Sequence, residues 1–269
     1  MKAGFLESTT VGFARAVTHA MQSEETARRR GLMQALDPRV RLVGVLALVL
    51  AVVVSRRVEV VGALFGFAIV LALLSHVSLW TLATRVWLIV FGFTGVIAIP
   101  ALFTTPGPAL LASGDLSITE PGLRTAMLLV LRVETAVTLT TVLILCTPWN
   151  HVLKALRALR VPKEVIAMLA MTYRYVFLLV DTAAQMVESR RSRTVGVLKR
   201  AEQRQIAART AGVLLSKSMA LSNEVYLSMQ SRGFRGDVQL LSEFRMTAWD
   251  YLGLLVLLST AVLAVWMGR

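Results

Sequence analysis

The chain has 269 residues, of which 56% are hydrophobic and 17% are charged, whereas an average soluble domain carries about 25% charged residues. Its 29 Lys and Arg outnumber 16 Asp and Glu, which gives a net charge of +13. A nucleic-acid-binding domain is also basic, but it is polar and rich in charge. The composition therefore excludes nucleic acid as a partner and indicates a multi-pass protein of the cell inner membrane, with basic loops on the cytoplasmic side.

Membrane spans are predicted wherever about 20 mostly apolar residues follow one another. Such stretches lie at 40–55, 58–75, 85–103, 123–146 and 249–267. A sixth span over 165–180 is an alternative, although Thr172 and Arg174 interrupt it, and this segment could equally lie in the membrane interface. The expected fold class is all-α: a polytopic membrane protein with five transmembrane helices, or six, and a cytoplasmic helical domain.

Small and turn-forming residues mark two further features of the first half. Gly62 and Gly66 have the small-xxx-small spacing that lets helices approach closely, and we expect them to pack within the bundle. The stretch 104–121 is rich in Gly, Pro and Ser and is expected to form a loop on the outer side.

Two charges lie inside the fourth span. Arg132 and Glu134 are surrounded by apolar residues, and charges at membrane depth face the bundle interior or a partner because they are costly in lipid. Residues two apart do not face each other on a helix, so each is expected to find its own partner. A functional or assembly role and plain structural pairing both remain open for the two residues.

The region 148–246 holds 16 Lys and Arg but only 7 Asp and Glu. Such an excess predicts a cytoplasmic location, which places the N-terminus inside as well and leaves Arg56 and Arg57 outside. The expected organisation has four parts. These are an N-terminal cytoplasmic or interfacial segment over 1–38, four transmembrane helices over 39–147, cytoplasmic helices over 148–246 and a last transmembrane helix over 247–269.

Three helices are predicted within the basic region. Thr147 and Pro148 provide a cap followed by proline at the first helical position, and Pro162 ends this amphipathic helix. A second helix begins near Lys163 and ends in a basic run over 188–194. The third extends over about 202–230 and ends in a second basic run over 231–236.

Both long helices thus end in small residues next to arginines. Arginine near a helix C-terminus complements the helix dipole, and glycine is a common cap. The alternative is docking, because an always-charged planar guanidinium suits carboxylates at protein interfaces. The candidate residues are Ser192, Arg193, Thr194, Ser231, Arg232 and Gly233, with Arg190 and Arg235 beside them.

Several motifs resemble one known family, the transmembrane component of energy-coupling factor transporters. The most specific are Thr147-Pro148-Trp149, the run from Ala155 to Pro162, Thr172-Tyr173-Arg174-Tyr175 and the two basic runs. The stretch from Leu36 to Leu42 (LDPRVRL) fits the cobalt-type branch, called CbiQ. The resemblance covers about residues 36–265.

The resemblance implies that two motifs similar to Ala-Arg-Gly dock into a pair of ABC-type ATPase subunits. Carried over, the first is Ser192-Arg193-Thr194, with Ser189-Arg190-Arg191 as an overlapping register, and the second is Ser231-Arg232-Gly233. The first departs from the family pattern at both small positions. The resemblance also implies a separate substrate-binding membrane subunit, metal-specific in the cobalt branch.

The expected function is coupling without catalysis. The sequence contains no P-loop, no H-E-x-x-H motif and no G-x-S-x-G elbow, so ATP hydrolysis is assigned to partner chains. Its single cysteine and three scattered histidines predict neither a metal site nor a cofactor in this chain. Cobalt or nickel as substrate follows from the branch resemblance alone.

Two other functional classes compete with this reading. A stand-alone secondary transporter or channel would line its pathway with Arg132 and Glu134. A membrane enzyme is the third class, but no recognisable catalytic constellation supports it. Co-purification separates them, because only a coupling subunit should retain ATPases.

Overall fold

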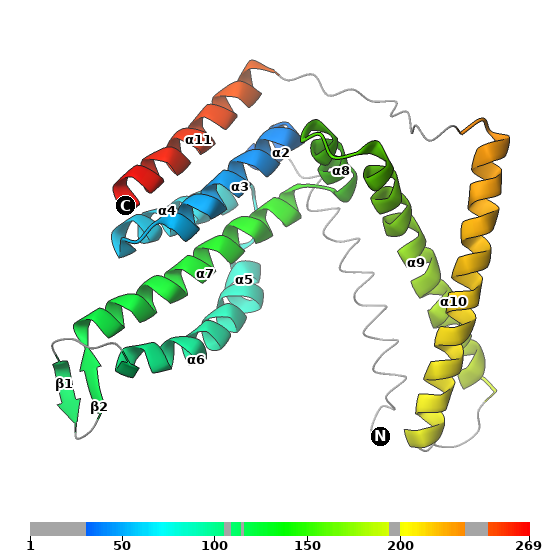
Figure 1. Ribbon diagram of the computed structural model, residues 1–269, viewed down its shortest axis with the longest axis horizontal. Helices are drawn as coiled ribbons and strands as arrows, with labels where there is room; N and C mark the ends of the chain where they lie inside the picture. The colour runs from blue at the N-terminus through cyan, green and yellow to red at the C-terminus, as the bar shows by residue number, and fades with distance from the viewer. Residues whose placement is uncertain (1–30, 105–108, 114–115, 194–199, 235–246) are drawn as a thin grey trace. The chain divides into compact units, whose positions relative to one another are not determined.

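The computed structural model describes residues 31–104, 109–113, 116–193, 200–234 and 247–269 (Figure 1). Most of the predicted N-terminal segment therefore lies outside the described residues. The chain forms two compact units. The first, which we call the membrane unit, contains the described residues up to 155 together with 247–269; the second, which we call the helix pair, contains 156–234.

All five predicted spans are helices in the membrane unit. They correspond to α3 (Pro38–Val54), α4 (Val58–Leu74), α6 (Leu88–Thr104), α7 (Glu120–Cys146) and α11 (Ala248–Gly268), and a short α2 (Leu32–Ala35) precedes them. By length and composition, the described residues include three helices that could cross a membrane: α7, α9 and α11. Residues 58–74 and 88–100 form shorter apolar helices.

The third span begins earlier than predicted. The helical segment α5 (Leu79–Leu82) continues through a π-helical turn (Ala83–Trp87) into α6 without leaving the helical region of backbone space. Arg85, where the sequence places the start, thus lies within the π-helical turn. A wide turn re-registers the helix without ending it, and no sequence rule marks such a turn.

The predicted outer loop contains a small hairpin. Strands β1 (Ala109–Ser113) and β2 (Leu116–Thr119) pair antiparallel, with Leu111 opposite Ile118. Apart from this hairpin, the regular structure of the described residues is helical, as the all-α class requires. A signal was present, since Gly114 and Asp115 separate two short apolar runs and Gly-Asp between such runs favours a two-residue hairpin turn.

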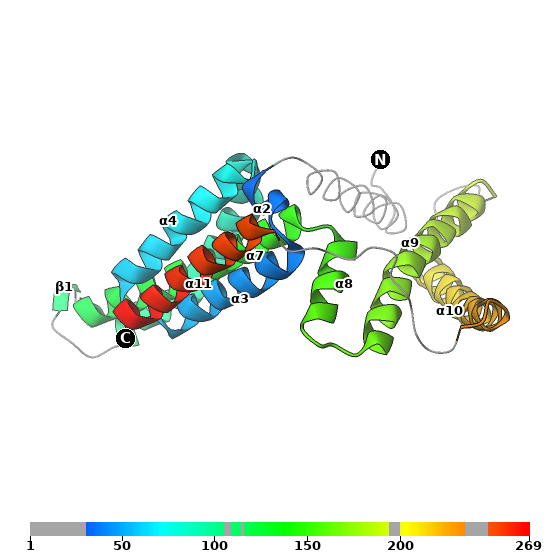
Figure 2. The same ribbon diagram turned by 90° about the horizontal axis from the view of Figure 1, so that it is seen from above.

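Helix α7 is central in the membrane unit and packs against α3, α4 and α6, while α11 packs along α3 (Figures 1 and 2). The core consists of small and branched apolar side chains, among them Leu48, Val61, Leu139 and Leu257. Gly44 permits a close approach of α3 and α11, because a Cβ atom there would overlap the side chain of Leu257. The predicted packing of Gly62 and Gly66 is wrong for the described part of the chain, where no atom lies within 4 Å of a Cβ built at either position.

Hydrogen bonds at both ends of the membrane unit show the helix directions. The Asp37 amide donates to Asp250 Oδ1 (2.6 Å), which joins the start of α3 to the start of α11. At the other end the Arg56 amide donates to the Gly268 carbonyl (2.8 Å). Helices α3 and α11 are therefore parallel.

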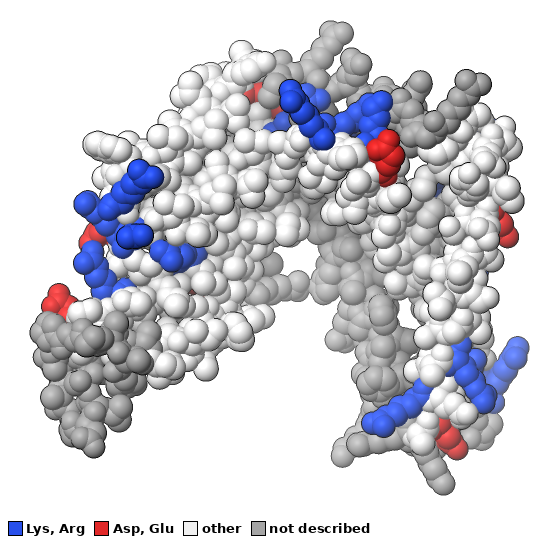
Figure 3. Space-filling view, in the orientation of Figure 1, with Lys and Arg blue, Asp and Glu red and all other residues white. Residues whose placement is uncertain are grey.

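The outer surface of the membrane unit is apolar. Phe91, Phe93, Ile97, Leu263 and Trp266 are each more than half exposed. On the face shown in Figure 3, the middle of this unit is uncharged, and Lys and Arg gather toward its ends. Contiguous exposed apolar surface of this kind indicates lipid contact, because water would penalise it.

The three predicted helices of the basic region are confirmed. They are α8 (Trp149–Ala158), α9 (Lys163–Arg191) and α10 (Arg200–Ser231). The predicted Thr147 cap is wrong, because Thr147 closes α7 and its hydroxyl bonds to none of the described residues. The Pro148 carbonyl accepts the first amides of α8, those of His151 and Val152. Arg160, at a left-handed φ of 63°, turns the chain toward Pro162 and α9.

Candidate functional site

The second arginine motif closes α10 with a Schellman cap. The amide of Phe234 bonds the Met229 carbonyl (3.0 Å), and that of Gly233 bonds the Gln230 carbonyl (2.9 Å). Gly233 has φ of 79°, the left-handed conformation that this cap requires and glycine tolerates. Arg232 therefore sits at the C-cap itself, with a backbone held by the turn.

The first motif follows α9 in a different way. Ser192 remains right-handed, and its amide bonds the Glu188 carbonyl (3.0 Å) while its hydroxyl donates to the Ser189 carbonyl (2.9 Å). The Arg193 amide bonds the Arg190 carbonyl (3.1 Å). Ser192 and Arg193 thus continue the right-handed turn at the end of α9, whereas the last position of the motif, Thr194, lies outside the described residues.

The described members of both motifs are exposed: Ser192, Arg193, Ser231, Arg232 and Gly233. The guanidinium groups of Arg193 and Arg232 make no hydrogen bond or ion pair with any described residue. Their backbones serve the helix ends and their side chains are available. Thr194 and Arg235 lie outside the described residues.

A polar cavity of about 410 Å³ adjoins the first motif. It lies between α9 and α10, and its lining residues are Thr182, Gln185, Met186, Ser189, Arg190, Arg193 and Lys217. Three of them are cations and none is acidic, so the cavity suits a carboxylate or phosphate. The sequence did not point to Lys217, because it is far from Arg193 in the chain and only the crossing of two helices brings it near.

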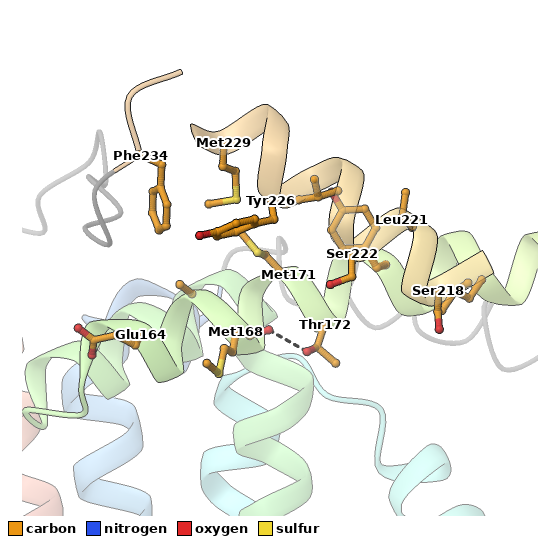
Figure 4. Close-up of a pocket in the computed structure, with 14 residues that line it drawn as sticks. Glu164, Met168, Met171, Thr172, Ser218, Leu221, Ser222, Tyr226, Met229 and Phe234 are labelled. Carbon is orange, nitrogen blue, oxygen red and sulfur yellow. Dashed lines mark hydrogen bonds between the residues drawn. The ribbon is translucent and has the colours of Figure 1, made fainter. Parts of the chain in front are cut away.

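An apolar groove of about 570 Å³ lies further along the same helix pair (Figure 4). Met168, Met171, Tyr226 and Met229 face it, and Phe234, just after the cap of α10, lies at one end. The groove was also missed, although Met168, Met171, Tyr175 and Leu179 recur at helical spacing along α9. Methionine-rich surfaces adapt to varied apolar partners because the side chain is unbranched and flexible.

Arg132 and Glu134 lie in the membrane unit and form no ion pair with each other. Arg132 Nη2 donates to the carbonyl of Ser55 at the end of α3 (2.8 Å). Glu134 is only 6% exposed, and neither carboxyl oxygen accepts a hydrogen bond from the described residues. Arg132 thus has a partner of its own, as predicted, whereas no partner of Glu134 lies among the described residues.

Polar groups also gather where the membrane unit passes into α8. Arg41 donates to the carbonyls of Cys146 (2.7 Å) and Gln34 (2.8 Å). His151 stands nearby on α8, and burial, followed by the positive charges of Arg41 and Lys154, lowers its pKa below the ordinary value. Across the described residues, no three His, Cys, Asp or Glu side chains converge as metal ligands would.

Comparison with known proteins places this arrangement in a family. The profile of the cobalt transport protein family, CbiQ, matches residues 30–241. The chain belongs to this family. The match runs from α2 to beyond the second arginine motif, so it includes the membrane helices α3 to α7 and the helix pair, and it ends before α11.

Individual relatives of this CbiQ-family chain were also found. It is 33% identical over 221 residues to the uncharacterized protein MJ1571 of Methanocaldococcus jannaschii, covering 80% of this chain and 76% of the relative. The cobalt transport protein CbiQ of Rhodobacter capsulatus is 28% identical over 176 residues, which are 64% of this chain and 72% of that protein. The energy-coupling factor transporter transmembrane protein EcfT of Bacillus subtilis is 23% identical over 247 residues, 87% and 91% of the two chains.

These comparisons confirm the resemblance seen in the motifs. The protein is a transmembrane component of a transporter and resides in a membrane, as its apolar helices require.

Proposed function

We propose that this chain is the non-catalytic coupling subunit of an ATP-driven importer, and that it passes ATPase movement to a separate substrate-binding membrane subunit. The observation that carries the proposal is the pair of exposed arginines, Arg193 and Arg232, which have no side-chain partner among the described residues and are each held by the capped end of a long helix. A rigid backbone beneath an available guanidinium favours docking, because little backbone conformational entropy is lost when a carboxylate binds. Two such ends match two ATPase subunits.

The topology proposed for the chain has five spans, with the helix pair in the cytoplasm. Arg41, at the start of α3, bonds the last carbonyl of α7, and Asp37 bonds Asp250 at the start of α11. The chain thus leaves and re-enters the membrane unit at the same end, so it crosses the membrane an even number of times between them. If α9 crossed, α10 would have to cross back, yet α10 carries six charged residues. The even number of crossings therefore favours a helix pair that does not span the membrane. The net charge of +9 over 148–246 favours a cytoplasmic location for this region, with the protein in the cell inner membrane.

The proposed cargo is a divalent metal ion, cobalt or nickel. The support is the name of the family and of its Rhodobacter relative. Metal selection is assigned to the substrate-binding subunit, and this chain is assigned neither cofactor nor resident metal.

Co-purification and crosslinking test the proposal. The tagged chain, co-expressed with candidate ATPases and a substrate-binding subunit, should retain both and support ATP-dependent uptake. Cysteines placed at Ser192 and Ser231 should crosslink to the ATPases, whereas a cysteine at Ser259, exposed on α11, should not. The native Cys146 is buried and gives little background. Uptake by the chain alone would instead favour the secondary transporter.

A further inference from the structure

The junction at one end of the membrane unit has no role in the function proposed above. We use the name polar junction for Gln34, Asp37, Arg41, Ser75, Cys146, Thr247 and Asp250. Arg41 is its centre: only 3% exposed, it donates through Nε to the Leu36 carbonyl (2.8 Å), through Nη1 to that of Cys146 (2.7 Å), and through Nη2 to that of Gln34 (2.8 Å). One buried guanidinium thus binds three carbonyls, two from the segment before α3 and one from the end of α7.

The other members bring the remaining helix ends to the same place. Asp250 accepts from the Asp37 amide through Oδ1 (2.6 Å), and from the Thr247 amide (2.8 Å) and hydroxyl (2.7 Å) through Oδ2. Gln34 Nε2 donates to the carbonyl of Ser75, which ends α4 (3.0 Å). Four helices, α3, α4, α7 and α11, are tied together here.

The bond to Cys146 matters most, because it holds the point where the chain leaves the membrane helix α7 toward α8. The last four carbonyls of a helix lack partners within it, and Arg41 supplies one across the bundle. Only Thr147 and Pro148 separate Cys146 from α8. Leu153 and Ala155, further along α8, are buried, so the connector is short and anchored on both sides.

We infer that Arg41 is a positioning residue for coupling, an inference that rests on the proposed function. By holding the exit of α7, it makes the connector stiff. Force that reaches α8 from α9 and α10 then moves the membrane helices instead of being absorbed between Cys146 and Trp149. A planar fork with five donors can serve three carbonyls at once, which a lysine ammonium on a flexible stem does not reproduce.

The chain offers a matched control at the opposite end. Arg132 also clamps a helix-terminal carbonyl, that of Ser55, at 2.8 Å. That carbonyl ends α3, where the chain turns into α4, and no connector to α8 starts there. Loss of either arginine removes hydrogen bonding between helices, but only Arg41 binds the end of the helix that leads to α8 and the helix pair.

The test compares Arg41→Gln, Arg41→Lys and Arg132→Gln in the reconstituted complex with its ATPases and substrate-binding subunit. ATPase retention, the ATP hydrolysis rate and metal uptake per ATP are measured for each. Both Arg41 variants should keep the ATPases and continue hydrolysis, while uptake per ATP falls about tenfold, as loss of a charged hydrogen bond would give. Arg132→Gln should reduce thermal stability but leave metal uptake per ATP at the wild-type value. An unchanged ratio in the Arg41 variants, or an equal fall in all three, overturns the inference.

An insertion in the connector tests the role of its stiffness even if an Arg41 variant fails to fold. Two glycines inserted between Thr147 and Pro148 leave Arg41 and its carbonyl partners in place, and they should lower uptake per ATP to the same extent. Full coupling by the insertion variant also overturns the inference. If the wild-type complex itself retained no ATPases, the proposed function would fail instead, so the two failures are distinct.

Discussion

The membrane unit and the helix pair use arginine at helix ends in opposite ways. In the membrane unit, Arg41 and Arg132 are turned inward and donate to terminal carbonyls of neighbouring helices. In the helix pair, Arg193 and Arg232 follow ends that are closed by backbone and serine bonds, and their guanidinium groups are exposed. The arginines of the membrane unit stabilise its own fold, whereas those of the helix pair are accessible to a partner.

The double substitution Arg193→Ala with Arg232→Ala should have the largest effect. If each arginine binds an ATPase carboxylate, truncation costs about 2–5 kcal/mol of association free energy per site. Lysine should rescue only in part because it lacks the planar fork. ATPase retention during purification and ATP-driven uptake measure the loss, with exposed Arg204→Ala on α10 as the control. Full retention in the double variant would leave the two arginines as helix caps worth about 0.3–1 kcal/mol each.

A bulky residue at Gly44 should damage the membrane unit and leave the helix pair intact. Gly44→Val places atoms into the space of Leu257 where α3 meets α11, and overpacking of this kind costs about 1–3 kcal/mol. Gly62→Val is the matched control, since nothing lies within 4 Å of its Cβ position. Thermal unfolding of the purified chain in detergent should show a lower midpoint for Gly44→Val only. Equal shifts would contradict the packing described for α3 and α11.

Lys217→Ala should weaken ATPase binding more mildly than loss of Arg193. Its ammonium contributes one of three positive charges to the cavity beside the first motif, and an exposed charge pair is worth about 0.2–1 kcal/mol. Binding titrations at two salt concentrations should show a smaller salt dependence than in the wild type. Arg209→Ala, exposed on the same helix outside the cavity, is the comparison, and an equal effect would mean that only total charge matters.

Acid should loosen the junction between α7 and α8 slightly, and this is the smallest effect expected. Burial and the charges of Arg41 and Lys154 lower the pKa of His151 from its ordinary 6.5. The unfolded chain then binds more protons than the folded one, so stability is lost as the pH falls below about 6.5 toward the lowered pKa. His151→Gln should remove this part of the pH dependence of thermal stability. An unchanged pH profile in the variant would contradict the assignment to His151.

Local patterns were sufficient for most of the architecture. Apolar length placed α3, α4, α7 and α11 within a few residues, and Pro162 separated α8 from α9. The exceptions arose where competing backbone arrangements have similar local signals. The third span begins at Leu79, because a π-helical turn joins α5 to α6. The first amides of α8 are bonded by the Pro148 carbonyl and not by the Thr147 side chain.

Features that join distant segments were beyond such patterns. Gly62 and Gly66 had the packing motif, yet Gly44 made the close contact, because which face of a helix meets another depends on the whole bundle. Lys217 and the apolar groove likewise required two helices to cross.

The sequence by itself determined that this is a helical membrane protein of the CbiQ family with two arginine-ended helices in a basic region, because span length, charge bias and short motifs are all local. Only the tertiary structure decided which arginines are available. Arg41 and Arg232 both stand beside helix ends in the sequence, but Arg41 meets the last carbonyl of α7, which is distant in the chain. The cap at Gly233 satisfies its own helix, and Arg232 is left exposed, with no side-chain partner in the described part of the chain. Whether an arginine side chain is used within the fold depends on which carbonyl groups the folded chain brings within hydrogen-bonding distance.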